Sequence, residues 1–157
     1  MKGRILLFAS IITASAGCGG GSTIGGLDAE AVYTISLAQA NQVPAPKATT
    51  ATGTATVVVY ADRVDYEVSA NSIIEVTAAH IHTGQPGVAG PIVVTLFNQP
   101  NNPISKNGVF ASGTLRDSNL PSGVTIDNLK SFIASGNGYI DIHTKANPNG
   151  ELRGQIR

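Results

Sequence analysis

From residue 32 onward, the sequence is a succession of short segments rich in Val, Ile, Thr and Tyr, separated by segments rich in Gly, Pro and Asn. β-Branched and aromatic residues favour pleated strands, whereas Gly, Pro and Asn favour turns. Each strand-like segment has six or seven residues, a usual strand length and short for a helix. This spacing predicts an all-β domain, either a Greek-key-like β-sandwich or a partly closed barrel. The strand-like segments are 32–37, 54–60, 63–68, 76–82, 92–97, 109–115, 139–144 and 151–157.

Two of these segments differ in how many faces they are expected to bury. In 63–68, the apolar residues Val64 and Val68 alternate with polar residues such as Asp65, which predicts a strand with one solvated face. The segment 92–97 is apolar almost throughout, which predicts a strand buried on both faces.

One segment has helical periodicity instead. Ile126, Leu129 and Ile133 recur at the spacing of one helix face, and Thr125 is a suitable N-cap residue. The sequence therefore predicts a single short helix near 126–134.

The amino-terminal segment has the features of an export signal. Lys2 and Arg4 precede an apolar stretch, residues 5–12. A bilayer-spanning helix needs roughly twenty apolar residues, so this stretch is too short to cross a membrane. We therefore predict that residues 1–17 form a signal peptide.

Two processing sites compete at the end of this segment. Residues 14–16 (ASA) fit an ordinary signal peptidase, which would give a soluble secreted protein. Residues 15–18 (SAGC) resemble a lipobox, although Ser replaces the usual Leu at its first position. Lipidation would explain the lone cysteine, and residues 18–31 would form a Gly-rich tether. We expect an exported lipoprotein of the bacterial envelope, anchored to the lipid bilayer through acylated Cys18.

Charge and motifs argue against two classes of function. The chain has 10 Lys and Arg residues against 10 Asp and Glu residues, and losing residues 1–17 would leave a net charge of −2. Without a basic surface, a nucleic-acid partner is not expected. The sequence also has no G-x-S-x-G motif and no recognisable pair of catalytic carboxylates. We therefore expect no enzymatic activity.

The histidines are the residues best suited to chemistry. His80 and His82 are two apart in a predicted strand, so their rings project from the same face. Two such imidazoles can bind one metal ion, and His143 could be a third ligand if its strand is a neighbour. Asp141 and Glu151 could add a carboxylate. The alternative is that these histidines form hydrogen bonds to loop backbone and stabilise the fold.

The closing hairpin gives a specific expectation for the charged residues around His143. If its strands pair about Pro148, His143 lies near Arg153. We expect Asp141, Glu151 and Arg153 to form cross-strand ion pairs on this hairpin.

Several ordered motifs together resemble a CHRD domain, the module first described in chordin, over residues 32–157. The resemblance implies a β-rich, exported domain. In chordin, growth-factor binding is carried largely by other modules, and the resemblance brings no catalytic residues. One departure is Asp141, which stands where the family often has Asn. The motifs are QVP (42–44), ATGTA (51–55), AHIHTG (79–84), GYIDIHT (138–144) and GELRGQI (150–156).

Two functions follow as hypotheses. The first is a non-catalytic binding or structural module of the cell envelope, with an envelope or extracellular protein as partner and an exposed apolar patch or sheet edge to receive it. The second is a metal-binding protein that holds one copper or zinc ion at His80, His82 and His143. The His-x-His strand is also similar to that of copper/zinc superoxide dismutase. However, three histidines cannot hold the two metals of that enzyme.

Overall fold

The computed structural model describes residues 28–157. The predicted signal peptide, Cys18 and most of the predicted tether lie outside the described residues. No helix among the described residues is long and apolar enough to cross a membrane.

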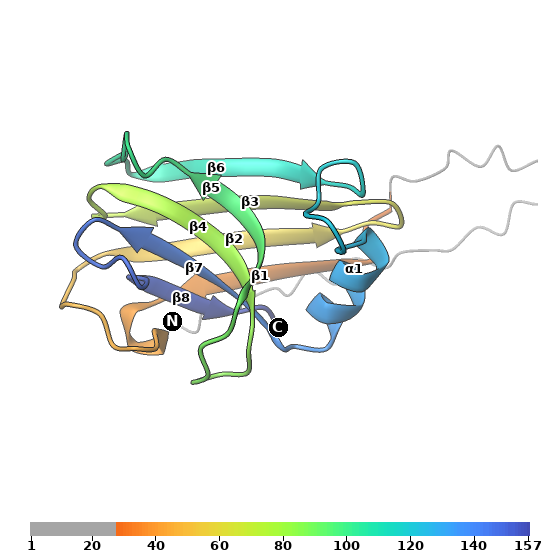
Figure 1. The fold of residues 1–157 in the computed structure, drawn as a ribbon, viewed down its shortest axis with the longest axis horizontal. Helices are drawn as coiled ribbons and strands as arrows, with labels where there is room; N and C mark the ends of the chain where they lie inside the picture. Colours follow the sequence, from red (N-terminus) through yellow and green to blue (C-terminus); the bar gives the residue numbers. More distant parts are fainter. Residues whose placement is uncertain (1–27) are drawn as a thin grey trace, which may run out of the picture.

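Eight strands form two four-stranded antiparallel sheets that pack face to face (Figure 1). One sheet has the order β1-β2-β3-β6 and the other β5-β4-β7-β8. The chain crosses between the sheets after β3, β5 and β6, which gives a Greek-key-like sandwich rather than a closed barrel. The all-β prediction is thereby confirmed. The strands are β1 (Ala31–Leu37), β2 (Thr52–Val59), β3 (Val64–Asn71), β4 (Val76–Thr83), β5 (Ile92–Asn98), β6 (Gly108–Leu115), β7 (Gly138–Thr144) and β8 (Leu152–Gln155).

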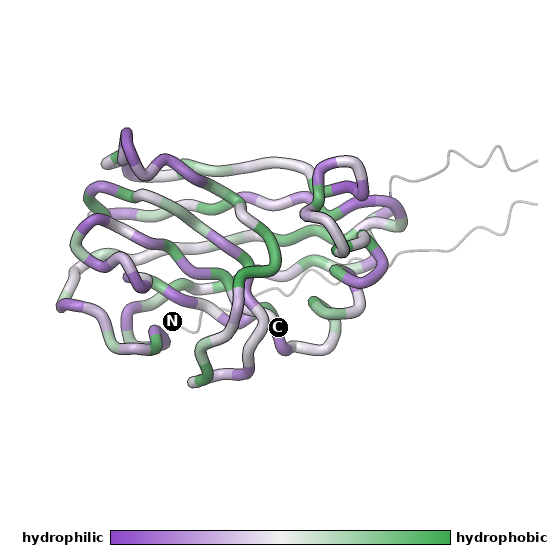
Figure 2. Tube along the Cα trace, in the orientation of Figure 1, coloured by the Kyte–Doolittle hydropathy of each residue, from purple (hydrophilic) through white to green (hydrophobic). Residues whose placement is uncertain are grey.

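The core lies between the two sheets and follows the period-2 alternation of the strands. Val57 and Val68 on one sheet and Ile81 and Ile140 on the other are fully buried there. Figure 2 shows that apolar and polar residues alternate along the strands. The outward side chains of each sheet are therefore free to build a site on the surface of the sandwich.

The predicted helix is confirmed as α1 (Ile126–Ala134), which lies at one end of the sandwich (Figure 1). The Thr125 side chain accepts a hydrogen bond from the Asn128 backbone N–H, which caps the helix. Ile126, Leu129 and Ile133 bury the apolar face of the helix in the core. A short 3₁₀ helix, η1 (Gln39–Asn41), follows β1.

The prediction that 92–97 is buried on both faces is wrong. β5 pairs only with β4 and is an edge strand of its sheet. Val94 and Leu96 point into the core, whereas Ile92 and Thr95 are exposed. In a two-layer sandwich each sheet has only one inner face, so apolar residues on the outer face stay partly in water.

The closing hairpin is also paired differently from the prediction. Arg153 is opposite Asp141 rather than His143. Gly150 has a φ of +110°, and the Glu151 side chain turns back into the loop, so the β7–β8 ladder begins only at Leu152. The strands therefore pair about Asn147 instead of Pro148, which moves each residue's partner by two positions.

Candidate metal centre

Four side chains from β4 and β7 converge on the outer face of their sheet. The two strands are antiparallel neighbours, and their register places His80 directly opposite Asp141. His82 lies on β4 beyond His80, and His143 lies on β7 beyond Asp141. One ligand atom from each of the four residues lies within 4.8 Å of the ligand atoms of the other three. All three predicted histidines and Asp141 are thus brought together.

Asp141 Oδ1 is the atom that the three rings share. It lies 3.0 Å from His143 Nε2, 3.1 Å from His82 Nε2 and 3.9 Å from His80 Nδ1. In a tetrahedral zinc site with bonds of 2.0–2.1 Å, adjacent ligand atoms are separated by about 3.3 Å. The observed separations from Oδ1 bracket this value, so one ion could bind all four groups with only small side-chain shifts.

Backbone carbonyls orient two of the rings. His82 Nδ1 donates a hydrogen bond to the Gly90 carbonyl oxygen (2.8 Å), and His143 Nδ1 donates to that of Pro148 (2.9 Å). Because a carbonyl oxygen only accepts, each Nδ1 carries a proton and each Nε2 faces Asp141. This is the outer-shell arrangement that orients histidine ligands in metal sites.

The centre has hydrogen-bonding capacity that is not used. His82 Nε2 and His80 Nδ1 are buried and have no hydrogen-bond partner among residues 28–157. Both atoms nevertheless face the Asp141 carboxylate. The lone pair of a neutral imidazole repels a carboxylate oxygen, so the arrangement is favourable only with a cation, either a proton or a metal ion, between them.

The pKa shifts reflect this crowding of ligands. Burial raises the pKa of Asp141, but the hydrogen bond from His143 and the adjacent His82 ring outweigh burial and hold it at about 2. Burial lowers the pKa of His143, but the bond to Asp141 outweighs burial, so this pKa is raised overall. Burial and the neighbouring charge of His143 lower the pKa of His80 to about 4. In the absence of metal, His143 is therefore the ring best placed to carry the proton that balances Asp141.

Tyr139 covers one side of the centre. Its ring stacks on that of His82, with centroids 4.9 Å apart and planes 8° apart. Its hydroxyl accepts a hydrogen bond from the Gly90 N–H (3.1 Å). Tyr139 therefore fixes both a candidate ligand and the carbonyl that orients it.

Arg153 does not form the predicted ion pairs. Its guanidinium lies over the Tyr139 ring, 3.5 Å from the centroid, and its Nη2 donates to the carbonyl oxygens of Gln85 and Val88. Arg153 thus holds the loop between β4 and β5 against the sheet. The cation–π contact and the two loop carbonyls replace the expected carboxylate.

Glu151 is also outside the centre, although the sequence offered it as a supporting carboxylate and a partner in an ion pair. Its carboxylate accepts hydrogen bonds from Thr49 Oγ1 (2.7 Å), Thr144 Oγ1 (2.6 Å) and Asn147 Nδ2 (3.0 Å). These bonds connect the segment before β2 to the closing hairpin. The role of Glu151 here is structural.

The sequence-based alternative, in which histidines form hydrogen bonds to loop backbone, is confirmed for His82 and His143. The sequence did not indicate that Gly90 and Tyr139 would be the residues that hold His82. A Cβ at Gly90 would lie 1.8 Å from the Thr83 carbonyl oxygen, so only glycine lets the loop return this closely to β4. Stacking of Tyr139 on His82 follows from the β4–β7 register, which local sequence does not specify.

Comparison with known proteins identifies the family. The family model for the CHRD domain matches residues 33–156, nearly all of the part that the structure describes. No curated protein and no solved structure gave a significant match. The CHRD domain is not a known enzyme family. The chain therefore belongs to the CHRD domain family.

Proposed function

We propose that this CHRD domain binds one divalent transition-metal ion, zinc or copper, through His80, His82, His143 and Asp141. The observation that carries the proposal is the convergence of three imidazoles on one carboxylate oxygen, with two ring nitrogens buried and unpartnered among the described residues. Buried polar atoms in folded proteins are nearly always hydrogen-bonded, so two on one point indicate a missing partner.

The donor set favours these ions. Three imidazoles and one carboxylate suit zinc and copper, whereas calcium and magnesium prefer all-oxygen sites. A dication would also be balanced in part by the Asp141 charge, in a place where that side chain is only 3% exposed. Four protein ligands around a tetrahedral ion leave no open position, which is the pattern of structural zinc sites.

We further propose that the domain is exported and held at the bacterial envelope by acylated Cys18, as a non-catalytic module. Support comes from the sequence features of residues 1–31 alone. A soluble secreted form is the alternative.

Binding of an envelope or extracellular protein ranks below metal binding. The large apolar residues that are exposed lie on different parts of the fold: Val32 is on β1, Ile74 is in the loop between β3 and β4, and Val109 is on β6. Singly exposed apolar residues are normal on protein surfaces and do not indicate a docking surface.

Metal content of the purified protein tests the proposal. The protein is stripped with a chelator, loaded with zinc or copper, dialysed and analysed for metal per chain. We expect close to one ion in the wild type, almost none in a His80→Ala/His82→Ala double variant, and wild-type content in Asp127→Asn. Asp127 is an exposed helix residue outside the centre, so Asp127→Asn controls for loss of a potential metal-binding side chain elsewhere on the surface. If the wild type retains no metal and the double variant is merely less stable, the histidines only hold the fold and the proposal is wrong.

A further inference from the structure

The four candidate ligands of the metal centre are not held equally. A backbone carbonyl and a stacked ring fix His82, and the Pro148 carbonyl fixes His143. His80 has no such support, because its Nδ1 makes no hydrogen bond in the described part of the chain and no carbonyl there orients its ring. Its Nδ1 is also 3.9 Å from Asp141 Oδ1, beyond the separation of about 3.3 Å expected in a tetrahedral site. His80 is therefore the ligand with the weakest hold on the ion.

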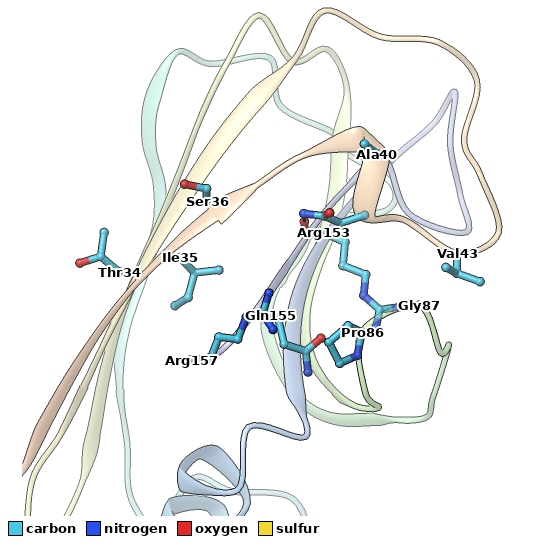
Figure 3. A pocket seen from close by; sticks show the side chains of 11 residues that line it. Thr34, Ile35, Ser36, Ala40, Val43, Pro86, Gly87, Arg153, Gln155 and Arg157 are labelled. Atoms are coloured by element: carbon cyan, nitrogen blue, oxygen red, sulfur yellow. Dashed lines mark hydrogen bonds between the residues drawn. The ribbon is translucent and has the colours of Figure 1, made fainter.

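The side of the centre toward β8 is covered. The Tyr139 ring lies against that of His82, and the Arg153 guanidinium lies over the other face of the Tyr139 environment, 3.5 Å from the ring centroid. Figure 3 shows the Arg153 side chain reaching Gly87 of the 84–91 loop, whose carbonyls at other positions accept its hydrogen bonds. These contacts keep His82 in place and close this side of the centre.

The side toward β5 is more open and less regular. β5 is an edge strand, and its Thr95, which is opposite His80, is exposed. The β4–β5 register shifts on both sides of the pair formed by His80 and Ile81. Such irregularities are frequent beside binding and active sites, because they re-aim a side chain. His80 can therefore turn toward solvent without breaking a hydrogen bond of its Nδ1 in the described part of the chain.

The charge of the loaded centre favours an anion as an incoming ligand. Asp141 is the only carboxylate within ion-pair distance of the three rings in the part of the chain that the structure describes. A divalent ion bound by one carboxylate and three neutral imidazoles keeps one positive charge. A small anion that replaces one imidazole would neutralise this charge in a largely buried place, where an uncompensated charge is unfavourable.

We propose that His80 is an exchangeable ligand, and that its displacement opens one coordination position of the ion to a small anionic ligand from solvent. The proposal rests on the proposed function, since it requires the metal. With His80 bound, four protein ligands close the ion. With His80 displaced, His82, His143 and Asp141 remain, and three protein ligands with one open position are the pattern of zinc sites that accept a further ligand.

Nitrogen NMR of the histidine rings in the zinc-loaded protein, titrated with azide, tests the proposal. Azide is the coordinating anion, and perchlorate at the same ionic strength is the control because it coordinates zinc very weakly. We expect zinc to shift His80 Nδ1, His82 Nε2 and His143 Nε2. Azide should then return His80 Nδ1 alone toward its metal-free resonance, in a saturable way and with zinc retained, whereas perchlorate should change none of the three.

The proposal is overturned if azide leaves all three rings bound to zinc, if it releases His82 or His143 first, or if it removes the zinc altogether. If zinc shifts no ring before azide is added, the proposed function fails as well. If zinc shifts the rings but His80 does not exchange, only the exchange is disproved and metal binding stands.

Two single variants give a second test. His80→Ala and His82→Ala each remove one ring from the same face of β4. His82→Ala should lose about 10–100 times more zinc affinity than His80→Ala, since that is the usual effect of outer-shell support and only His82 of the two has it. His80→Ala should also bind azide more tightly than the wild type, because no ring competes for the position. Equal loss of zinc affinity in both variants, or unchanged azide affinity in His80→Ala, contradicts the proposal.

Discussion

At the residue scale, Asp141 is the residue on which the candidate metal centre depends most. Its Oδ1 is the one atom that all three histidines face, and its side chain is almost inaccessible to solvent. Among the four candidate ligands, Asp141 is the only carboxylate, so it alone can balance the charge of a bound cation. An amide oxygen could still bind a metal ion, but it would not balance the charge of that ion.

Gly90→Ala should weaken metal binding without touching a ligand. The new Cβ would collide with the Thr83 carbonyl and displace the carbonyl that orients His82. Loss of such an outer-shell partner typically reduces metal affinity by about 10–100-fold. Competition titration with a zinc-binding dye measures the change. Gly87→Ala is the control, because a Cβ there meets nothing within 4 Å and only its φ of +79° is strained. Equal loss of affinity in both variants would show that loop strain alone is responsible.

Tyr139→Phe and Tyr139→Leu separate the stacking contact from the hydroxyl. Phe retains the ring between His82 and Arg153 and loses only the bond to Gly90, so we expect a loss of about 1 kcal/mol in stability. Leu also removes both ring contacts and should cost about 1–2 kcal/mol more. Urea unfolding of the two variants tests this order, and a Leu variant as stable as the Phe variant would contradict it.

At the element scale, two strands show where patterns along the chain mislead. The apolar run of β5 predicted burial on both faces, but its edge position in a two-layer sandwich leaves Ile92 in water. In the closing hairpin, pairing about Pro148 would have placed His143 opposite Arg153. The observed pairing is instead centred on Asn147, because a turn signal in the sequence locates the turn but does not specify the register of the strands that flank it.

Glu151→Ala should destabilise the whole closing hairpin. The substitution leaves Thr49, Thr144 and Asn147 without the acceptor that they share. Each unsatisfied buried donor costs about 1–3 kcal/mol, so we expect a loss of about 3 kcal/mol or more in the free energy of unfolding. Chemical denaturation measures it, with Glu67→Ala on the exposed face of β3 as the control. A loss no larger than that of Glu67→Ala would show that the Glu151 network contributes little to stability.

At the scale of the whole molecule, the proposed metal would join the two middle strands of one sheet to two loops. His82 is held by the 84–91 loop and His143 by the closing turn, so an ion at the centre would fix both loops at once. Folding and metal binding should therefore be coupled.

Zinc should raise the free energy of unfolding of the wild-type protein. A ligand that binds only the folded state stabilises it by about 2.7 kcal/mol at a free concentration 100 times its Kd. Thermal unfolding with and without zinc should show this rise in the wild type, reversed by a chelator and absent in the His80→Ala/His82→Ala variant. An equal rise in that variant would place the zinc elsewhere.

The sequence determined those features that depend on neighbouring residues. Strand-like composition and spacing predicted an all-β fold, and period-2 alternation placed His80 and His82 on the same face of their strand. The short helix and its Thr125 N-cap were also predicted from neighbouring residues alone. All of these follow from backbone geometry over a few residues.

Only the tertiary structure decided which strands became neighbours. The pairing of β4 with β7 brought His143 and Asp141 to the His-x-His pair, and the returning loop placed Gly90 and Tyr139 around it. Strand partners are selected by burial of the inner faces of both sheets at once, which is a property of the whole chain. The candidate metal centre on the outer face is a consequence of that choice, so its ligands could be named from the sequence but their convergence could not be determined from it.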